Sequence, residues 1–140
     1  SIGDYKAAIA MGNWGPGPLF VFRDPSSGWA YGIQTAGGPN NWTCAGISPP
    51  LSYLTTVDNT FHHVAVVLDA PASRCDLYSD GQLIHTDLFV DGQTSFGTDP
   101  LYIGGFGDFD RLHSEIDDVR LYNRALSAAE VQQLSSMGGP

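Results

Sequence analysis

The sequence predicts an all-β protein, an antiparallel β-sandwich with one short C-terminal helix. Short segments of alternating apolar and polar residues recur along the chain with turn residues between them, which is typical of antiparallel sandwiches. Seventeen glycines and nine prolines in 140 residues suit a chain of strands and turns. Apolar residues at helical spacing occur in a single segment near the C-terminus.

The N-terminal part of the chain reads as four strands joined by loops. The expected strands are 4–11, 19–23, 29–35 and 42–47. Asp-Pro-Ser-Ser-Gly at 24–28 is a turn sequence, so we expect the second and third strands to form a hairpin. Residues 53–59 fit a further edge strand or a loop.

The pattern sharpens after residue 60, where three strands follow one another as a meander. In FHHVAVVLD (61–69), Val64, Val66 and Leu68 share one face. Strands at 74–79 and 82–88 follow. Asp80-Gly81 between them predicts a two-residue turn of the primed type, because glycine tolerates positive φ. A short strand is expected at 101–103.

The segment 114–134 predicts one more strand and then the helix. Val119 and Leu121 alternate with polar neighbours, as in a strand with one buried face. Ser127 and Glu130 have the spacing of a capping box, which begins a helix with an apolar side. The predicted core comprises Val64, Val66, Leu68, Leu77, Ile103, Val119 and Leu121.

Four segments together resemble a known family. The sequence IDDVRLYNRALSAAEV (116–131) is similar to the closing signature of laminin G-like domains, jelly rolls of the concanavalin A-like lectin/glucanase superfamily. FHHVAVVLD, DLYSDGQLI (76–84) and LYIGG (101–105) agree in the same order. The resemblance spans about 61–134. It implies one jelly-roll domain over 1–140, lacking the family's opening strands, in a secreted or cell-surface protein.

Charge excludes two classes of partner. Fifteen acidic residues against six basic ones give a net charge of −9. Nucleic acid and anionic membrane surfaces need a basic footprint, so neither is expected. No apolar run approaches the roughly 20 residues of a membrane helix, so we expect no membrane insertion.

The two cysteines, Cys44 and Cys75, each lie in a predicted strand. One interpretation is a disulfide between neighbouring strands, which fits a secreted protein. The other is a pair of buried free thiols, since cysteine packs as a small hydrophobe. Both interpretations stay open at this point.

A hydrolase of the glucanase type is the enzymatic alternative. Hydrolases of the same superfamily use a strand motif E-x-D-x-x-E, and Glu115-Ile116-Asp117 matches its first half. Arg120 stands where the second catalytic carboxylate is needed. We therefore expect no catalytic residues and no enzymatic activity.

Histidines and acidic residues are the candidate metal ligands of the sequence. His62 and His63 alternate across a strand and cannot share one metal, so packing or hydrogen bonding is expected of both. His85 and His113 lack ligand spacing and are expected at the surface. Asp117 falls on the apolar face of its strand and needs a partner. That partner is either calcium, held together with Asp108 and Asp110, or a structural one, namely backbone amides, Arg120 or Arg124.

Aromatic side chains next to short polar ones suggest a sugar-binding site. Sugars lay their C–H faces on flat rings while their hydroxyls bond to nearby polar groups. The candidate residues are Asn13, Trp14, Asn41, Trp42 and Phe109. Trp29 and Tyr31, by contrast, are expected in the core.

The sequence is compatible with two main functional classes and with a third possibility. We expect a non-catalytic carbohydrate-binding or adhesive recognition module that binds a glycan or polysaccharide. The alternative is a hydrolase or lyase on the same fold, which is an analogy of fold alone. The third is a jelly roll for oligomerisation. Without the opening strands, one sheet edge would be unpaired. We expect that edge to be covered either by a second copy of the chain in a homodimer or by residues 1–4.

Overall fold

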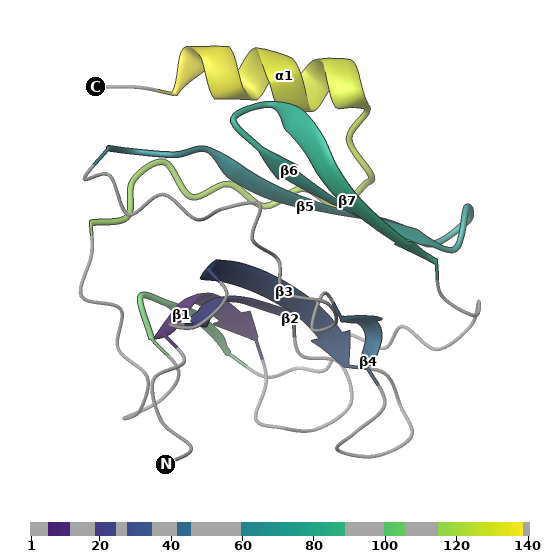
Figure 1. The fold of residues 1–140 in the computed structure, drawn as a ribbon, viewed down its shortest axis with the longest axis horizontal. Coiled ribbons are helices and arrows are strands. Elements are labelled where there is room, and N and C mark those ends of the chain that lie inside the picture. Colours follow the sequence, from purple (N-terminus) through teal and green to yellow (C-terminus); the bar gives the residue numbers. More distant parts are fainter. Residues whose placement is uncertain are drawn as a thin grey trace.

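Eight strands and one helix form the described part of the chain in the computed structural model (Figure 1). Side chains are described for Ile9 and for residues 60–88, 100–105 and 115–138, and the strands before residue 46 are described as backbone. The strands are β1 (Lys6–Met11), β2 (Leu19–Asp24), β3 (Gly28–Gln34), β4 (Trp42–Ala45), β5 (Val64–Asp69), β6 (Arg74–Ser79), β7 (Gln82–Leu88) and β8 (Leu101–Ile103). The helix is α1 (Ala128–Met137). The described chain is therefore mostly β with one helix, as predicted.

The strands form two sheets in which every described pairing is antiparallel. One sheet has five strands in the order β4-β3-β2-β1-β8, and the other has three in the order β5-β6-β7. The predicted hairpin is confirmed by the pairing of β2 with β3, and the predicted meander by β5-β6-β7. Residues 53–59 lie outside the described residues.

Both faces of the three-stranded sheet are apolar. On one face Cys75 and Leu77 are buried, and Val64, Val66, Leu68 and Ile84 pack against them. On the other face Val67 and Tyr78 form a cluster with Val131 of α1. Figure 1 shows α1 lying across this second face, with the five-stranded sheet beyond the first. The helix therefore covers apolar surface that a two-layer fold of strands alone would expose.

The β6–β7 turn has the predicted primed geometry. Ser79 pairs with Gln82, and the two residues between them have positive φ, 50° at Asp80 and 78° at Gly81. The Asp80 carboxylate accepts the His63 amide at 2.9 Å, and the Asp80 amide donates to the His63 carbonyl at 2.8 Å. The turn thus holds the residues that precede β5. The sequence pattern predicted that this strand begins at residue 61, whereas it begins at Val64.

The N-terminus of α1 has the predicted capping box. The Ser127 hydroxyl accepts the Glu130 amide at 3.3 Å, and the Glu130 carboxylate accepts the Ser127 amide at 2.8 Å. Arg124 binds both oxygens of this carboxylate, at 3.0 and 2.7 Å. This arginine and the Ser127 groups lower the pKa of Glu130 to about 2. Three residues therefore fix where the helix begins.

Two parts of the sequence prediction are wrong. Residues 115–122 form no strand, and Leu121 is 58% exposed. Asp118 has a φ of 52° and binds Arg120 through two contacts of 2.8 Å, so the extended backbone that alternation requires is interrupted there. Ile103 is 54% exposed because the three-residue edge strand β8 pairs with β1 alone. Val119 is half-buried, and the other predicted core residues lie in the core.

Candidate functional site

The predicted sugar-binding residues fall mostly outside the described part of the chain. Asn13, Trp14, Asn41 and Phe109 lie outside it. Trp42 is the first residue of β4 and stands opposite Gln34 of β3. Because β4 is an edge strand of the five-stranded sheet, the candidate Trp42 begins a strand at the margin of that sheet.

The strand β4 is tied to the three-stranded sheet in two ways. It lies against β7. In addition, Cys75 of β6 is fully buried and disulfide-bonded, and Cys44 of β4 is the one other cysteine of the sequence. The disulfide interpretation is therefore confirmed. The bridge joins strands of two different sheets, and the prediction of neighbouring strands is wrong.

A histidine–aspartate pair lies on β7, on the side of β4. His85 Nε2 donates to Asp87 Oδ1 at 3.1 Å, and both side chains are half-buried. His85 stands opposite Leu77 and Asp87 opposite Cys75, so both lie on the face that carries the disulfide. His85 reaches the surface only in part, with 30% of its side chain exposed, because it stands opposite the core residue Leu77. His113 lies outside the described residues.

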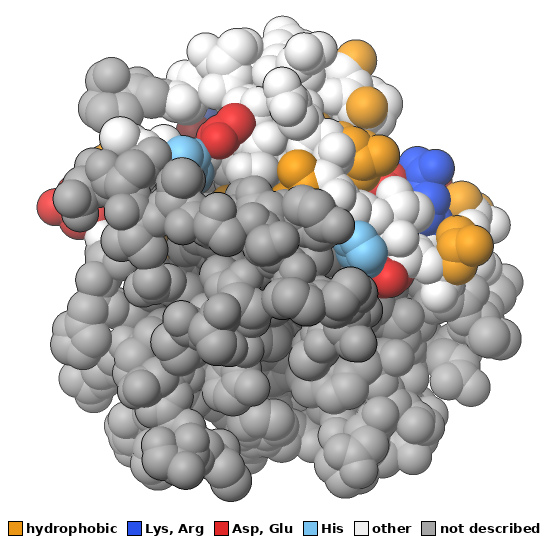
Figure 2. Space-filling view, viewed as in Figure 1, with side chains coloured by type: hydrophobic (Ala, Val, Ile, Leu, Met, Phe, Trp, Pro, Cys, Tyr) orange, Lys and Arg blue, Asp and Glu red, His pale blue; other side chains and the backbone are white. Residues whose placement is uncertain are grey.

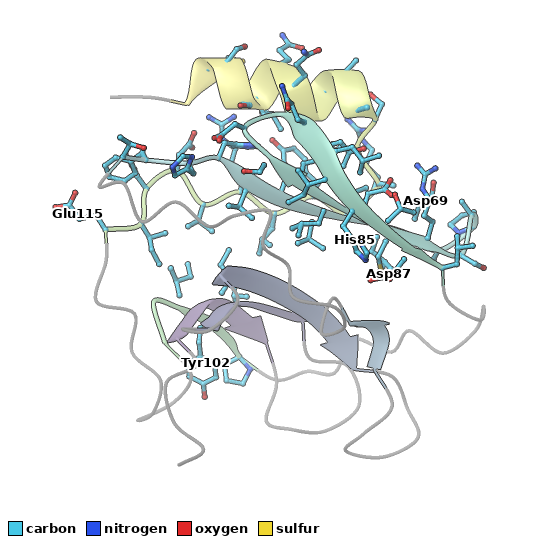
Figure 3. The ribbon with its side chains drawn as sticks, viewed as in Figure 1. Asp69, His85, Asp87, Tyr102 and Glu115 are labelled. Carbon is cyan, nitrogen blue, oxygen red and sulfur yellow. The ribbon has the colours of Figure 1, made fainter. Side chains whose placement is uncertain are left out.

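Further charged residues lie at the same end of the sheet, but on its opposite face, the one that α1 covers. Asp69 stands opposite Arg74, which in turn stands opposite Leu88, the neighbour of Asp87. Figure 3 shows Asp69, His85 and Asp87 at this end. We call this group, together with Asp76, the polar end of the sheet; its members are Asp69, Arg74, Asp76, His85 and Asp87.

Within the polar end, Asp76 is a buried carboxylate. Its side chain is 2% exposed, lies 2.8 Å from the Arg74 guanidinium and accepts the Thr86 hydroxyl at 2.7 Å. These partners compensate for removing the charge from water. Asp69 accepts the Ala72 amide at 3.1 Å and so fixes the β5–β6 turn.

A second histidine–aspartate pair lies at the opposite end of the sheet. His62 Nδ1 donates to Asp80 Oδ2 at 2.9 Å. The neighbouring His63 has a half-buried ring whose buried Nδ1 has no hydrogen-bond partner. Burial lowers the pKa of His63, with Arg120 acting in the same direction and Asp80 and Asp118 opposing it. Hydrogen bonding and packing are therefore the roles of these histidines, as predicted. Figure 2 shows histidine surface beside acidic surface at two places on this face.

The predicted calcium ligands are only partly described. Asp117 is exposed, and its carboxylate accepts the Asp118 amide at 2.7 Å; Arg120 and Arg124 bind Asp118 and Glu130 instead. Of the structural partners predicted for Asp117, the backbone amide is thus the one observed. Asp108 and Asp110 lie outside the described residues. Among the residues with described positions, no group of three or more His, Cys, Asp or Glu side chains has the arrangement of a metal site.

The half-matched hydrolase motif lies in exposed chain. Glu115 and Asp117 are both exposed, and Figure 3 shows Glu115 pointing away from the sheets. Arg120, at the third motif position, is engaged with Asp118.

The His85–Asp87 pair and β4 together offer groups that suit a sugar. His85 donates its Nε2–H to Asp87, and a carboxylate accepts several hydrogen bonds, so Asp87 can accept hydrogen bonds from sugar hydroxyls. Sequence reasoning considered neither His85 nor Asp87 for this role. The signal that could have found them is their spacing of two residues on a predicted strand, which places both side chains on one face.

Comparison with known proteins identifies the family. This β-rich chain with a histidine–aspartate pair matches the Laminin_G_3 family model, described as the concanavalin A-like lectin/glucanases superfamily, over residues 3–132. The chain belongs to this superfamily, and the resemblance seen in the sequence is confirmed. No curated protein matches the chain at a significant level.

One solved structure is similar. It is the crystal structure of residues 221–444 of an S-layer domain-containing protein from Clostridium thermocellum, with 23% sequence identity and a TM-score of 0.45. The match covers 86% of this chain and 57% of that one, so this chain spans little more than half of the solved protein. Separately, the described residues include no helix with the length and hydropathy to cross a bilayer.

Proposed function

We propose that the domain is a non-catalytic carbohydrate-binding or adhesive recognition module of a secreted or cell-surface protein. The observation that carries the proposal is the contact between β4 and β7, which brings the strand beginning at Trp42 next to the strand of His85 and Asp87. A ring for stacking and a polar pair for hydroxyls are the two parts that a sugar site requires. Membership of a superfamily of lectins and glucanases supports a sugar as the ligand.

Binding is favoured over hydrolysis by the position of the acidic residues. Retaining hydrolysis needs two carboxyl groups about 5 Å apart across the scissile bond. Glu115 lies in exposed chain outside any described strand, and the residue at the third motif position is an arginine paired with Asp118. We therefore expect no release of reducing sugar from β-glucans. Release by the wild-type domain that disappears in Glu115→Gln would contradict this expectation.

The full architecture and location are part of the proposal. We propose that the two sheets pack face to face as a jelly-roll sandwich. The apolar cluster around Leu77 and the bridge from β6 to the strand of Cys44 support this packing. Disulfides persist in oxidising compartments, which supports an extracellular or cell-surface location.

Calcium binding and dimerisation remain proposals with direct tests. The exposed Asp117 carboxylate suits one oxygen ligand of calcium, with Asp108 and Asp110 as the further ligands. A calorimetric titration with calcium should show heat of binding for the wild-type domain and none for Asp117→Asn. For a homodimer, the edge strand β8 with exposed Ile103 is a suitable surface. A monomeric mass by light scattering at tens of micromolar concentration rules the dimer out.

A glycan array tests the proposed function. The array is run in parallel with and without a calcium chelator. The purified domain should bind a restricted set of glycans. Trp42→Ala should weaken binding roughly tenfold, the effect of losing about 1.4 kcal/mol of contact. Phe61→Ala removes an aromatic side chain that is 51% exposed at the opposite end of the three-stranded sheet, and it should leave binding unchanged. Binding of no glycan, or equal effects of the two variants, would overturn the proposal.

A further inference from the structure

The disulfide lies beside the proposed glycan site. Cys75 of β6 stands directly opposite Asp87 of β7, so the two residues share the face that also carries His85. Residues paired in this way have their Cβ atoms roughly 4.5–5.5 Å apart. Cys75 is bonded to Cys44, which belongs to β4, the strand that begins at Trp42. The bridge therefore ties β4 to the position next to Asp87.

We propose that the disulfide is a positioning element of this site: it holds β4 against β7, and the domain binds glycan tightly only while the bridge is intact. Cys75 is fully buried, so its sulfur atom does not contact the glycan and acts through the strand that it anchors. This inference rests on the proposed function and specifies what keeps the two halves of its site together.

The pairing of β4 within its own sheet is short and irregular. The strand has four residues, lies at the edge of the five-stranded sheet and pairs with β3. The register shifts between Ile33 and Gln34, at the end of β4 where Trp42 lies. In the described part of the chain the two sheets share no strand pairing, so β4 lies against β7 without a ladder of backbone hydrogen bonds. The covalent bond at Cys44 is what fixes β4 to the other sheet.

The β7 half of the site is held in a different way. The residues from 82 to 88 pair with β6, and the hydrogen bond between His85 and Asp87 lies within β7 itself. Loss of the bridge should therefore leave this pair in place and make β4 less restrained. A glycan would then have to order β4 as it binds, and the cost of that ordering lowers its affinity.

The test measures glycan affinity with and without the bridge. The oligosaccharide that binds most tightly on the array is titrated by calorimetry into wild type and into Cys44→Ala/Cys75→Ala, at a temperature where circular dichroism shows both to be folded. The variant should bind about tenfold more weakly, the effect of ordering roughly one or two side chains on binding. Where this variant does not fold, Cys44→Ala/Cys75→Val, which restores apolar volume at the buried position, takes its place.

A destabilised variant with an intact bridge is the matched control. Gly81→Ala places a methyl group against α1 at the β6–β7 turn, at the end of the sheet opposite to Cys75 and Asp87. It should bind the oligosaccharide as tightly as wild type. A bridge that only stabilised the fold would leave the affinity of both folded variants unchanged.

A double-mutant cycle shows which half of the site the bridge positions. Trp42→Ala should weaken binding about tenfold in wild type and less than about threefold without the bridge, because residue 42 is then no longer held at the site. Asp87→Asn should weaken binding by the same factor in both backgrounds, since β6 holds β7. Coupling to Trp42 alone is a result that general destabilisation does not produce.

The outcomes separate this inference from the proposed function. Unchanged affinity of the variant without the bridge overturns the inference and leaves the carbohydrate-binding function standing. Equal weakening by Gly81→Ala, or an equal effect of Trp42→Ala in both backgrounds, overturns the positioning role of the disulfide. Binding of no glycan at all overturns the proposed function, and the inference with it.

Discussion

The Cα atom of Gln132 lies 3.1 Å from the place that a Cβ atom on Gly81 would occupy. The β6–β7 turn and the middle of α1 therefore meet backbone against backbone. The same turn binds the residues before β5 through Asp80. One tight turn thus connects the helix, the meander and the chain that enters it.

Replacing this glycine should destabilise the domain in two ways. In Gly81→Ala the new methyl group meets α1 at 3.1 Å, and the residue keeps a φ of 78°. We expect a loss of roughly 1–2 kcal/mol from the backbone and about 1–3 kcal/mol more from the clash. Gly104→Ala is the matched control, since φ is 79° and the nearest atom lies at 3.8 Å. Urea unfolding measures both, and equal losses would show that α1 does not press on the turn.

The helix cap should make stability depend on acid pH. Arg124 and the Ser127 groups lower the pKa of Glu130 to about 2 in the folded state, from an ordinary value of 4.5. A lowered carboxyl pKa gives stability that is present above pH 4.5 and disappears as the pH falls towards 2. Thermal melts of wild type and Glu130→Gln should therefore differ at pH 7 and converge near pH 2. A constant difference across this range would contradict the role of the charge.

A second pH effect is expected nearer neutrality, from His63. Burial lowers its pKa below 6.5 in the folded state, against the attraction of Asp80 and Asp118. The unfolded chain then takes up the proton first, so stability is full above pH 6.5 and falls as the pH drops through the folded pKa. Between pH 8 and 5, the unfolding free energy of wild type should fall more steeply than that of His63→Gln. His62→Gln, which removes a more exposed ring, serves as control.

Reduction of the disulfide should cost stability. The bridge from Cys75 closes a loop to Cys44, 31 positions earlier in the sequence. Chain-entropy arguments give about 3.5 kcal/mol for a loop of this length. The double variant Cys44→Ala/Cys75→Ala should lower the unfolding free energy by about this amount, measured in urea without reductant. An unchanged value, or insensitivity of wild type to reductant, would contradict a structural role for the bridge.

The sequence predicted those features whose causes lie within a few residues of each other. The Asp80-Gly81 turn and the Ser127–Glu130 cap depend on backbone geometry and on neighbours three residues apart, so both were correct. Period-two alternation likewise placed β5, β6 and β7. The failure at Leu121 is local too, because alternation does not reveal a residue with positive φ. Leu121 alternates like a core residue, but the left-handed Asp118 takes its segment out of any strand.

In the candidate site, by contrast, contacts between distant parts of the chain decide the outcome. Trp42 was proposed from its residue type and its neighbour, and it lies at the beginning of an edge strand. His85 and Asp87 gain interest only because β4 lies against β7, a contact between strands that lie some forty residues apart in sequence. The sequence also could not predict that the disulfide joins strands of two different sheets, because no local pattern specifies which strands meet.

The position of α1 has a consequence for the order in which the chain can fold. The meander is synthesised about forty residues before the helix that covers Val67 and Tyr78. At about 5–20 residues per second, its outer apolar face stays uncovered for several seconds after β7 has been made. During that interval the nascent sheet is a target for chaperones and for other nascent chains, and Val131 ends the exposure when it docks.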